Sequence, residues 1–128
     1  MAVELLNNSS MLSEVHLIGG KLSKGSQLAT GGNSINTLAE ITADICFLGT
    51  GYMDLDKGIT EIDWEIAQMK KAMVNASRKI VSLSISKKLD TINRYKICDL
   101  TQVDTLVTEL DPSDKSLEKY QKAGLKLL

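Results

Sequence analysis

Two glycine-containing turns are the first features of the sequence that could bind a ligand. Gly19 and Gly20 follow one apolar run, and Gly49 and Gly51 flank Thr50 after a second. Backbone N–H groups freed by such turns can surround the oxygens of a phosphate, and a lysine at a strand end supplies the opposite charge. The second turn lacks the third glycine of a Gly-x-Gly-x-x-Gly fingerprint, so we do not expect a dinucleotide site.

Side chains that could hold a metal are few. His16 is the single histidine of the sequence and lies between Val15 and Leu17 on a predicted strand, so no zinc site can be assembled from standard ligand spacing. Cys46 and Cys98 both lie in apolar surroundings, which favours buried, reduced thiols. We therefore expect neither a metal nor another cofactor.

Short apolar runs that end at glycine predict the strands that would position the two turns. Such runs cover residues 15–18 and 43–48, and a third apolar run covers residues 79–83. Between the second and third runs, apolar residues at helical spacing predict a helix, and these are Ile62, Ile66, Met69 and Met73. Thr60, three residues before Asp63, is the expected N-cap of this helix.

The last third of the chain repeats the alternation of strand and helix. Residues 103–107 predict a strand entered from a turn at 99–102, and Asp111 and Pro112 predict the start of a helix that stops at Gly124. Strands that alternate with helices predict an α/β fold with a mainly parallel sheet flanked by helices. Ligands of such sheets bind beyond the carboxyl ends of the strands, where both glycine turns lie.

The composition of the chain argues against several classes of function. The chain has 128 residues, of which 43% are hydrophobic and 24% charged, which is typical of one globular domain. Fifteen basic residues against sixteen acidic ones argue against a protein that coats nucleic acid or a membrane surface. No apolar run is long enough to span a bilayer, and the first residues lack a secretory pattern, so we expect a cytoplasmic protein.

Five short motifs follow one another in a fixed order. They are Leu17-Ile18-Gly19-Gly20-Lys21, Ala43-Asp44-Ile45-Cys46-Phe47-Leu48-Gly49-Thr50-Gly51-Tyr52-Met53-Asp54, Gly58-Ile59-Thr60, Lys70-Lys71-Ala72-Met73 and Ser86-Lys87-Lys88. Their order and spacing resemble the C-terminal effector domain of DeoR-type bacterial transcriptional repressors. That family has a Gly-Gly turn, an Asp-x-x-Phe-Leu-Gly strand, a Gly-Leu-Thr segment, a Lys-Arg-Ala-Met helix and an Asp-x-Ser-Lys loop. The resemblance runs from residue 2 to the end of the chain.

The resemblance implies a fold similar to that of ribose phosphate isomerase and the CoA transferases, used for sensing instead of catalysis. It implies that a phosphorylated sugar or sugar alcohol is the effector of a repressor, and that DNA is contacted only through an attached winged helix-turn-helix domain. The residues that it assigns to the effector are Gly19, Gly20, Lys21, Gly49, Gly51 and Lys88.

The sequence departs from the family pattern in three places. Ile85 stands where the family's last loop has Asp, so an acceptor for sugar hydroxyls is missing, and Ile66 replaces one of two paired acids. The family's first strand, Asp-x-Gly-Thr-Thr phosphate loop, helix and Thr-Asn-Ser segment would precede Ala2, and they are absent together with the winged helix-turn-helix. We therefore expect residues 1–128 to form one partial effector domain that self-associates through the uncovered sheet edge.

Other interpretations remain open from the sequence. A tight turn alone would explain Gly19 and Gly20. Loss of sensing would leave an oligomerisation module, because the phosphate loop is missing. An isomerase-like enzyme would need a positioned carboxylate, which Asp54, Asp56 or Glu61 could supply, but none has a plausible partner. We predict that the chain is not an enzyme.

Several polar and aromatic side chains near these motifs are expected to have no ligand. Lys70 and Lys71 lie off the apolar stripe of their helix and are expected to be exposed, as is Lys87. Trp64 and Tyr52 are expected to pack at a helix start or a loop rather than to stack on a sugar.

Overall fold

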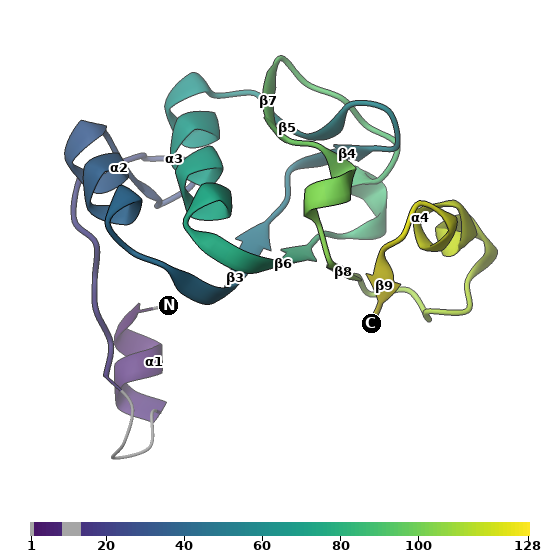
Figure 1. Cartoon of the computed structure of the whole chain (residues 1–128), viewed down its shortest axis with the longest axis horizontal. Helices are drawn as coiled ribbons and strands as arrows, with labels where there is room; N and C mark the ends of the chain where they lie inside the picture. Colours follow the sequence, from purple (N-terminus) through teal and green to yellow (C-terminus); the bar gives the residue numbers. More distant parts are fainter. Residues whose placement is uncertain (1, 9–13) are drawn as a thin grey trace.

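The computed structural model describes residues 2–8 and 14–128, and a parallel sheet forms its centre (Figure 1). Four strands lie in the order β3, β6, β8, β9, and each neighbouring pair is parallel. Their bounds are Ala43–Gly49, Ser77–Leu83, Thr105–Val107 and Lys126–Leu127. The strands predicted at 43–48 and 79–83 are confirmed. The strand predicted at 103–107 begins two residues later, at Thr105. The predicted α/β fold with a mainly parallel sheet is thus confirmed.

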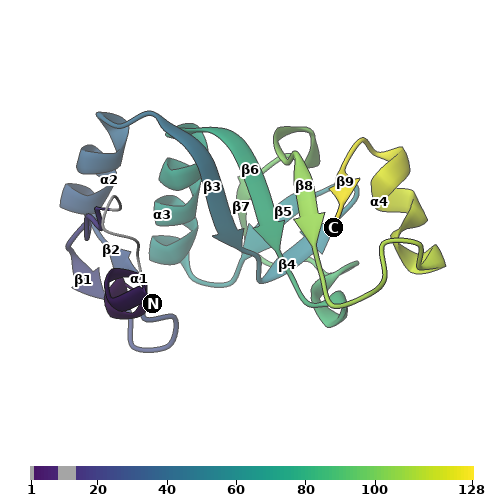
Figure 2. The same ribbon diagram turned by 90° about the horizontal axis from the view of Figure 1, so that it is seen from below.

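The two faces of the parallel sheet differ in what covers them. Leu48 and Leu106 point into the core, where α3 (Trp64–Asn75) packs against the sheet, and both are fully buried. Side chains alternate along a strand, so Ile45 and Phe47 lie on the opposite face, where they are 49% and 65% exposed. In the described part of the chain β3 pairs only with β6, so it is an edge strand (Figure 2).

A second sheet, which the sequence analysis did not predict, packs beside α3. It consists of three antiparallel strands in the order β4 (Tyr52–Asp54), β5 (Gly58–Glu61), β7 (Tyr95–Cys98). Asp54 Oδ1 closes the hairpin by accepting the N–H groups of Asp56 and Lys57, both at 2.9 Å. Gly58 has φ +74°, and a Cβ there would lie 2.2 Å from the Cys98 carbonyl oxygen, so this turn requires glycine.

The predicted central helix is present, but it begins later than its apolar stripe suggested. Asp63 is the N-cap of α3, and its Oδ1 accepts the Ile66 N–H at 3.0 Å. The prediction of Thr60 as N-cap is wrong, because Thr60 belongs to β5. Ile62 lies between β5 and α3 and is 56% exposed, whereas Ile66 and Met69 are buried as predicted.

The amino-terminal part differs from the prediction. The strand predicted at 15–18 is not formed; instead β1 (Lys21–Leu22) and β2 (Ala29–Thr30) make a two-stranded antiparallel hairpin. The apolar run ending at Gly19 has no partner strand among the described residues, and a strand needs one to satisfy its backbone. Two helices, α1 (Ala2–Asn8) and α2 (Gly32–Ala39), were not predicted.

The carboxyl-terminal part confirms the turn and corrects the helix start. The turn at 99–102 contains η2 (Leu100–Gln102), with a reciprocal cap between Asp99 and Gln102. Asp111 is not a helix N-cap, because its Oδ1 accepts the Ser113 N–H in a separate turn. Asp114 caps η3 (Lys115–Leu117) instead, and this turn leads into α4 (Glu118–Lys122). The helix ends before Gly124, as predicted.

Both cysteine side chains belong to the hydrophobic core. Cys46 and Cys98 are buried and not disulfide-bonded, as the sequence indicated. Burial raises the pKa of both thiols, that of Cys98 to about 11, where the neighbouring Asp99 adds to the effect. Neither thiol is therefore a reactive nucleophile near neutral pH. None of the helices in residues 2–8 and 14–128 is long and apolar enough to cross a membrane.

Candidate functional site

The candidate site lies at the carboxyl end of the parallel sheet. β3 ends at Gly49 and β6 ends at Leu83, and the Thr50 N–H donates to the Leu83 carbonyl at 2.9 Å. The Ser84 N–H in turn donates to the Val107 carbonyl of β8 at 3.0 Å. These bonds continue the ladder one residue past each strand, so the loops leave the sheet from a fixed edge.

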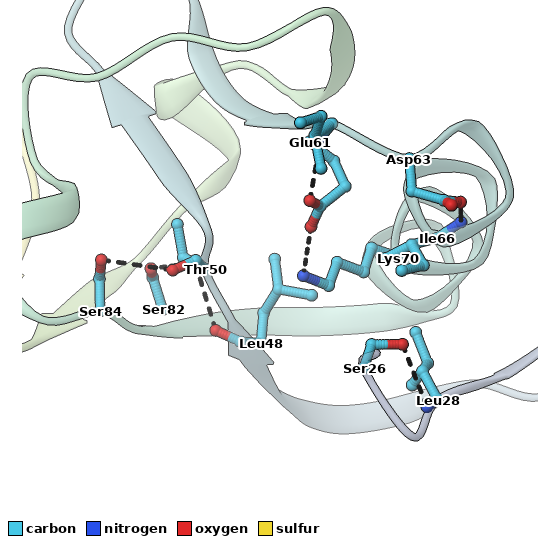
Figure 3. Close-up of polar contacts among 11 residues, drawn as sticks. Ser26, Leu28, Leu48, Thr50, Glu61, Asp63, Ile66, Lys70, Ser82 and Ser84 are labelled. Carbon is cyan, nitrogen blue, oxygen red and sulfur yellow. Dashed lines mark hydrogen bonds and ion pairs between the residues drawn. The ribbon is translucent and has the colours of Figure 1, made fainter. Parts of the chain in front are cut away.

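Three hydroxyl groups form a row behind this edge (Figure 3). Thr50 Oγ1 and Ser82 Oγ are 2.6 Å apart, and Ser84 Oγ donates to the Thr50 carbonyl at 3.5 Å. All three side chains are buried and hydrogen-bonded. This row was not predicted, although the spacing of Ser82 and Ser84 in a strand would place both on one face. The row fixes the backbone on both sides of Thr50.

Gly51 lies against a buried ion pair. A Cβ at Gly51 would be 3.5 Å from Glu61 Oε2, which accepts from Lys70 Nζ at 2.8 Å. Figure 3 shows the two side chains pointing toward each other, and those of Glu61 and Lys70 are only 9% and 15% exposed. The prediction that Lys70 is an exposed charge is therefore wrong, because Glu61 recruits it. Lys71, by contrast, is exposed as predicted.

Lys88 reaches the same edge from η1 (Ser86–Lys88). Its Nζ lies 4.9 Å from the centre of the Tyr52 ring, a cation–π contact with the first residue of β4. The Gly49–Gly51 loop immediately precedes Tyr52 in the sequence, so Tyr52 links Lys88 to that loop. Lys87 points to solvent, as predicted. Lys88 is half-buried, whereas its neighbour Lys87 is exposed.

A carboxylate that was not predicted from the sequence lies beside η1. Glu109 follows β8 and accepts the Ser86 N–H at 2.8 Å and the Ser86 Oγ at 2.5 Å. Thr108 Oγ1 adds a third hydrogen bond at 2.6 Å. The hydrogen bonds from Ser86 and Thr108 lower the pKa of Glu109 to about 2. The loop that contains Ile85 therefore has an ionised carboxylate beside it, which comes from the segment after β8 and whose oxygens accept from Ser86 and Thr108.

Gly19, Gly20 and Lys21 are held by different elements. Ser34 Oγ of α2 donates to the Gly19 carbonyl at 2.5 Å. A Cβ at Gly20 would lie 2.2 Å from the same Ser34 Oγ, so packing against α2 requires this glycine. Lys21 Nζ lies 3.4 Å from Glu65 Oε2 in the first turn of α3, and both side chains are exposed. The structure thus places Gly49 and Gly51 just before Tyr52, whose ring contacts Lys88, and it places the other three predicted residues at the starts of α2 and α3.

A shallow groove of about 210 Å³ opens where α2 and α3 begin. Its lining residues are Gly31, Gly32, Ile35, Trp64, Glu65 and Gln68. The Trp64 ring packs edge-on against Tyr95, with 5.2 Å between ring centres, which fits its predicted packing role. No group of three or more potential metal ligands occurs in the part of the chain that the structure describes.

Two of the three carboxylates considered for proton transfer, Asp54 and Glu61, accept hydrogen bonds that hold the fold together. Asp54 accepts the two N–H groups of its hairpin turn, and Glu61 is paired with Lys70 and also accepts the Ile62 N–H at 2.9 Å. Asp56 is exposed in the same hairpin turn. The hydrogen bonds of Asp54 and Glu61 leave these two carboxylates without the freedom of a proton shuttle.

The chain is similar to known regulators over most of its length. A family model described as the DeoR C-terminal sensor domain matches residues 1–110. GlpR, an HTH-type transcriptional regulator of Haloferax volcanii, is 27% identical over 125 residues, which are 98% of this chain and 48% of that protein. GlcR, an HTH-type transcriptional repressor of Bacillus subtilis, is 26% identical over 115 residues, 90% of this chain and 44% of that protein. The chain therefore spans less than half the length of these relatives.

Proposed function

Because this chain belongs to the family of DeoR C-terminal sensor domains, we propose that it binds a phosphorylated sugar or sugar alcohol as an effector. In a repressor, binding would change how a winged helix-turn-helix domain elsewhere in the protein contacts its operator in the cytoplasm. The family assignment confirms the resemblance found in the sequence. A sensing role in transcription regulation follows from that family, whereas the chemical nature of the effector is our proposal.

One observation carries the proposal: two glycines that have room for a side chain stand at the end of β3, immediately before Tyr52, whose ring contacts the ammonium of Lys88. A Cβ at Gly49 would meet no atom within 4 Å, and one at Gly51 would make only ordinary contacts with Glu61. The fold therefore does not require glycine at either position. Close approach of a ligand to the backbone explains both, since backbone N–H groups bind phosphate oxygens best without a side chain between them.

Lys21 supplies a second cation in the proposal. Its pair with Glu65 is exposed and 3.4 Å long, so it contributes little to stability. An arriving phosphate could replace Glu65 as the partner of Lys21 at little cost. Gly19 and Gly20 would form the backbone beside it, although the contact of Gly20 with Ser34 already explains that glycine.

Calorimetric titration with hexose, pentose and triose phosphates, each beside its unphosphorylated sugar, tests the proposal. We expect one phosphorylated compound to bind and to raise the melting temperature, because a ligand that binds only the folded state stabilises it. Lys88→Ala should weaken binding by about tenfold to a hundredfold, as expected for a lost charged hydrogen bond. Lys87→Ala, the matched exposed neighbour, should leave affinity unchanged. Equal affinity for both variants, or no binding at millimolar concentration, contradicts the proposal.

The uncovered face of β3 favours self-association as a further part of the function. Ile45 and Phe47 present apolar side chains to solvent, and the β3 backbone is unpaired on one side among the described residues. Proteins normally cover such an edge. We propose that a second copy of the chain does so, which makes the domain both sensor and oligomerisation module. If no sugar phosphate binds, the oligomerisation role alone remains.

A sugar-phosphate isomerase is the less favoured alternative. Proton transfer requires a carboxylate free to reach the substrate. Glu61 is held by Lys70, and Asp54 by its hairpin turn. The relatives are regulators by name, which also speaks against an enzyme. NMR of a sugar phosphate incubated with the protein would reveal turnover, and we expect none.

A further inference from the structure

The loop that follows Lys88 has an unusual backbone. Asp90 has φ +58°, in the left-handed region that few residues other than glycine and asparagine or aspartate adopt. On either side, the Leu89 N–H donates to the Ser86 carbonyl at 3.0 Å and the Thr91 N–H to the Met53 carbonyl at 3.0 Å. Thr91 Oγ1 also donates to the Lys88 carbonyl at 2.6 Å. The position of Lys88 therefore depends on the conformation of Asp90.

Two residues of α4 hold Asp90 in this conformation. The Tyr120 hydroxyl accepts the Asp90 N–H at 3.0 Å and donates to Asp90 Oδ1 at 2.8 Å. Lys119 Nζ pairs with the second carboxylate oxygen, Oδ2. The Tyr120 side chain is fully buried in the core, so its hydroxyl is a rigid anchor. Although burial opposes it, the hydrogen bonds from Lys119 and Tyr120 lower the pKa of Asp90, which stays ionised near neutral pH.

We propose that Tyr120 and Lys119 are positioning residues for Lys88, acting through Asp90, so that anion binding at the sheet edge depends on the docking of α4. The proposal rests on the proposed function, because it takes Lys88 as an effector ligand. Residues 119 and 120 lie beyond the segment that the family model matches, which ends at residue 110. The position of Lys88 would thus be fixed by a part of the chain outside that match.

Hydrogen exchange measures the positioning without any ligand. Tyr120→Phe keeps the buried ring and removes the hydroxyl, and Lys119→Met removes the ammonium. We expect the Leu89 and Thr91 amides, whose own acceptors are unchanged, to exchange at least about fivefold faster in Tyr120→Phe, relative to the Ile80 amide of β6 in the same protein. Lys122→Met, which breaks the exposed pair with Glu118 on the same helix, should change nothing in the loop. Unchanged exchange at Leu89 and Thr91 overturns the proposal.

Inorganic phosphate then tests the consequence for binding. NMR titration of the wild-type protein should shift the Lys88 amide, and the dissociation constant should rise about fivefold to tenfold in Tyr120→Phe and in Lys119→Met, but not in Lys122→Met. Faster exchange with unchanged phosphate affinity would mean a structural role only and overturn the proposal. A wild-type protein with no phosphate response at Lys88 would contradict the proposed function instead, and the exchange rates would still decide whether α4 positions the loop.

Discussion

Lys70 Nζ of α3 donates to Glu61 Oε2 of β5 at 2.8 Å, and both side chains are almost completely buried. Removal of one partner leaves the other charge uncompensated in the interior. We expect Lys70→Met to lower the free energy of unfolding by about 3 kcal/mol in urea denaturation. Lys71→Met, the exposed neighbour on the same helix, should change it by less than about 0.5 kcal/mol. Similar effects of the two substitutions would show that the ion pair does not matter.

Gly20 and Gly19 should differ sharply in their tolerance of a methyl group. A Cβ at Gly20 would meet Ser34 Oγ at 2.2 Å and the Thr30 carbonyl oxygen at 2.6 Å, whereas one at Gly19 would meet nothing within 4 Å. We expect Gly20→Ala to lower the free energy of unfolding by about 1–3 kcal/mol, and Gly19→Ala to change it little. Equal melting temperatures for the two variants would mean that the hairpin packs on α2 differently.

We expect Glu109 to contribute to the stability of the folded state in a way that depends on pH. Its pKa is lowered from the ordinary value of 4.5 to about 2 by hydrogen bonds from Ser86 and Thr108. A lowered pKa means that the carboxylate stabilises the folded state above about pH 4.5, and that this effect is lost as the pH falls through about 2. NMR titration of the Glu109 carboxyl carbon should show the low pKa, and Ser86→Ala should raise it. A Glu109 pKa near 4.5 in the wild-type protein would rule out these hydrogen bonds in solution.

The exposed face of β3 predicts the oligomeric state. Light scattering during size-exclusion chromatography should show a dimer or larger species for the wild-type chain. Phe47→Ser should shift this species towards the monomer, because it removes the most exposed large side chain of β3. Leu17→Ser, which changes a still more exposed residue outside the sheet, serves as the control and should leave the oligomer intact. A monomeric wild-type protein would contradict self-association through the edge strand β3.

Strands could be predicted from the sequence where local signals sufficed. The apolar runs at 43–48 and 79–83 form strands because each finds a neighbour in the parallel sheet. The run at 15–18 has the same pattern and forms none, since pairing depends on a partner that the pattern cannot reveal. The N-cap was misassigned for a similar reason: Thr60 is used by β5, which leaves Asp63 to cap α3.

The candidate site was predictable only in part. Glycine turns mark where the chain leaves the sheet, so Gly49 and Gly51 could be placed at its edge from the sequence. The burial of Lys70 could not, because its partner Glu61 comes from a strand of the unpredicted second sheet. The hydrogen bond between Asp90 and Tyr120 joins residues far apart in the chain, and such contacts leave no periodic signal.

The order of the parallel strands also bears on how fast the chain folds. β3 and β6 pair from Ala43 with Ser77 to Gly49 with Leu83, and β4, β5 and α3 all lie between them in the sequence. The β4–β5 hairpin, in which Asp54 pairs with Gly58, closes a far shorter loop. Because closing long loops costs more chain entropy before contacts form, we expect the hairpin early and the parallel sheet late. The sheet edge at which β3 ends in Gly49 and β6 in Leu83 would then be among the last parts of the molecule to form during refolding.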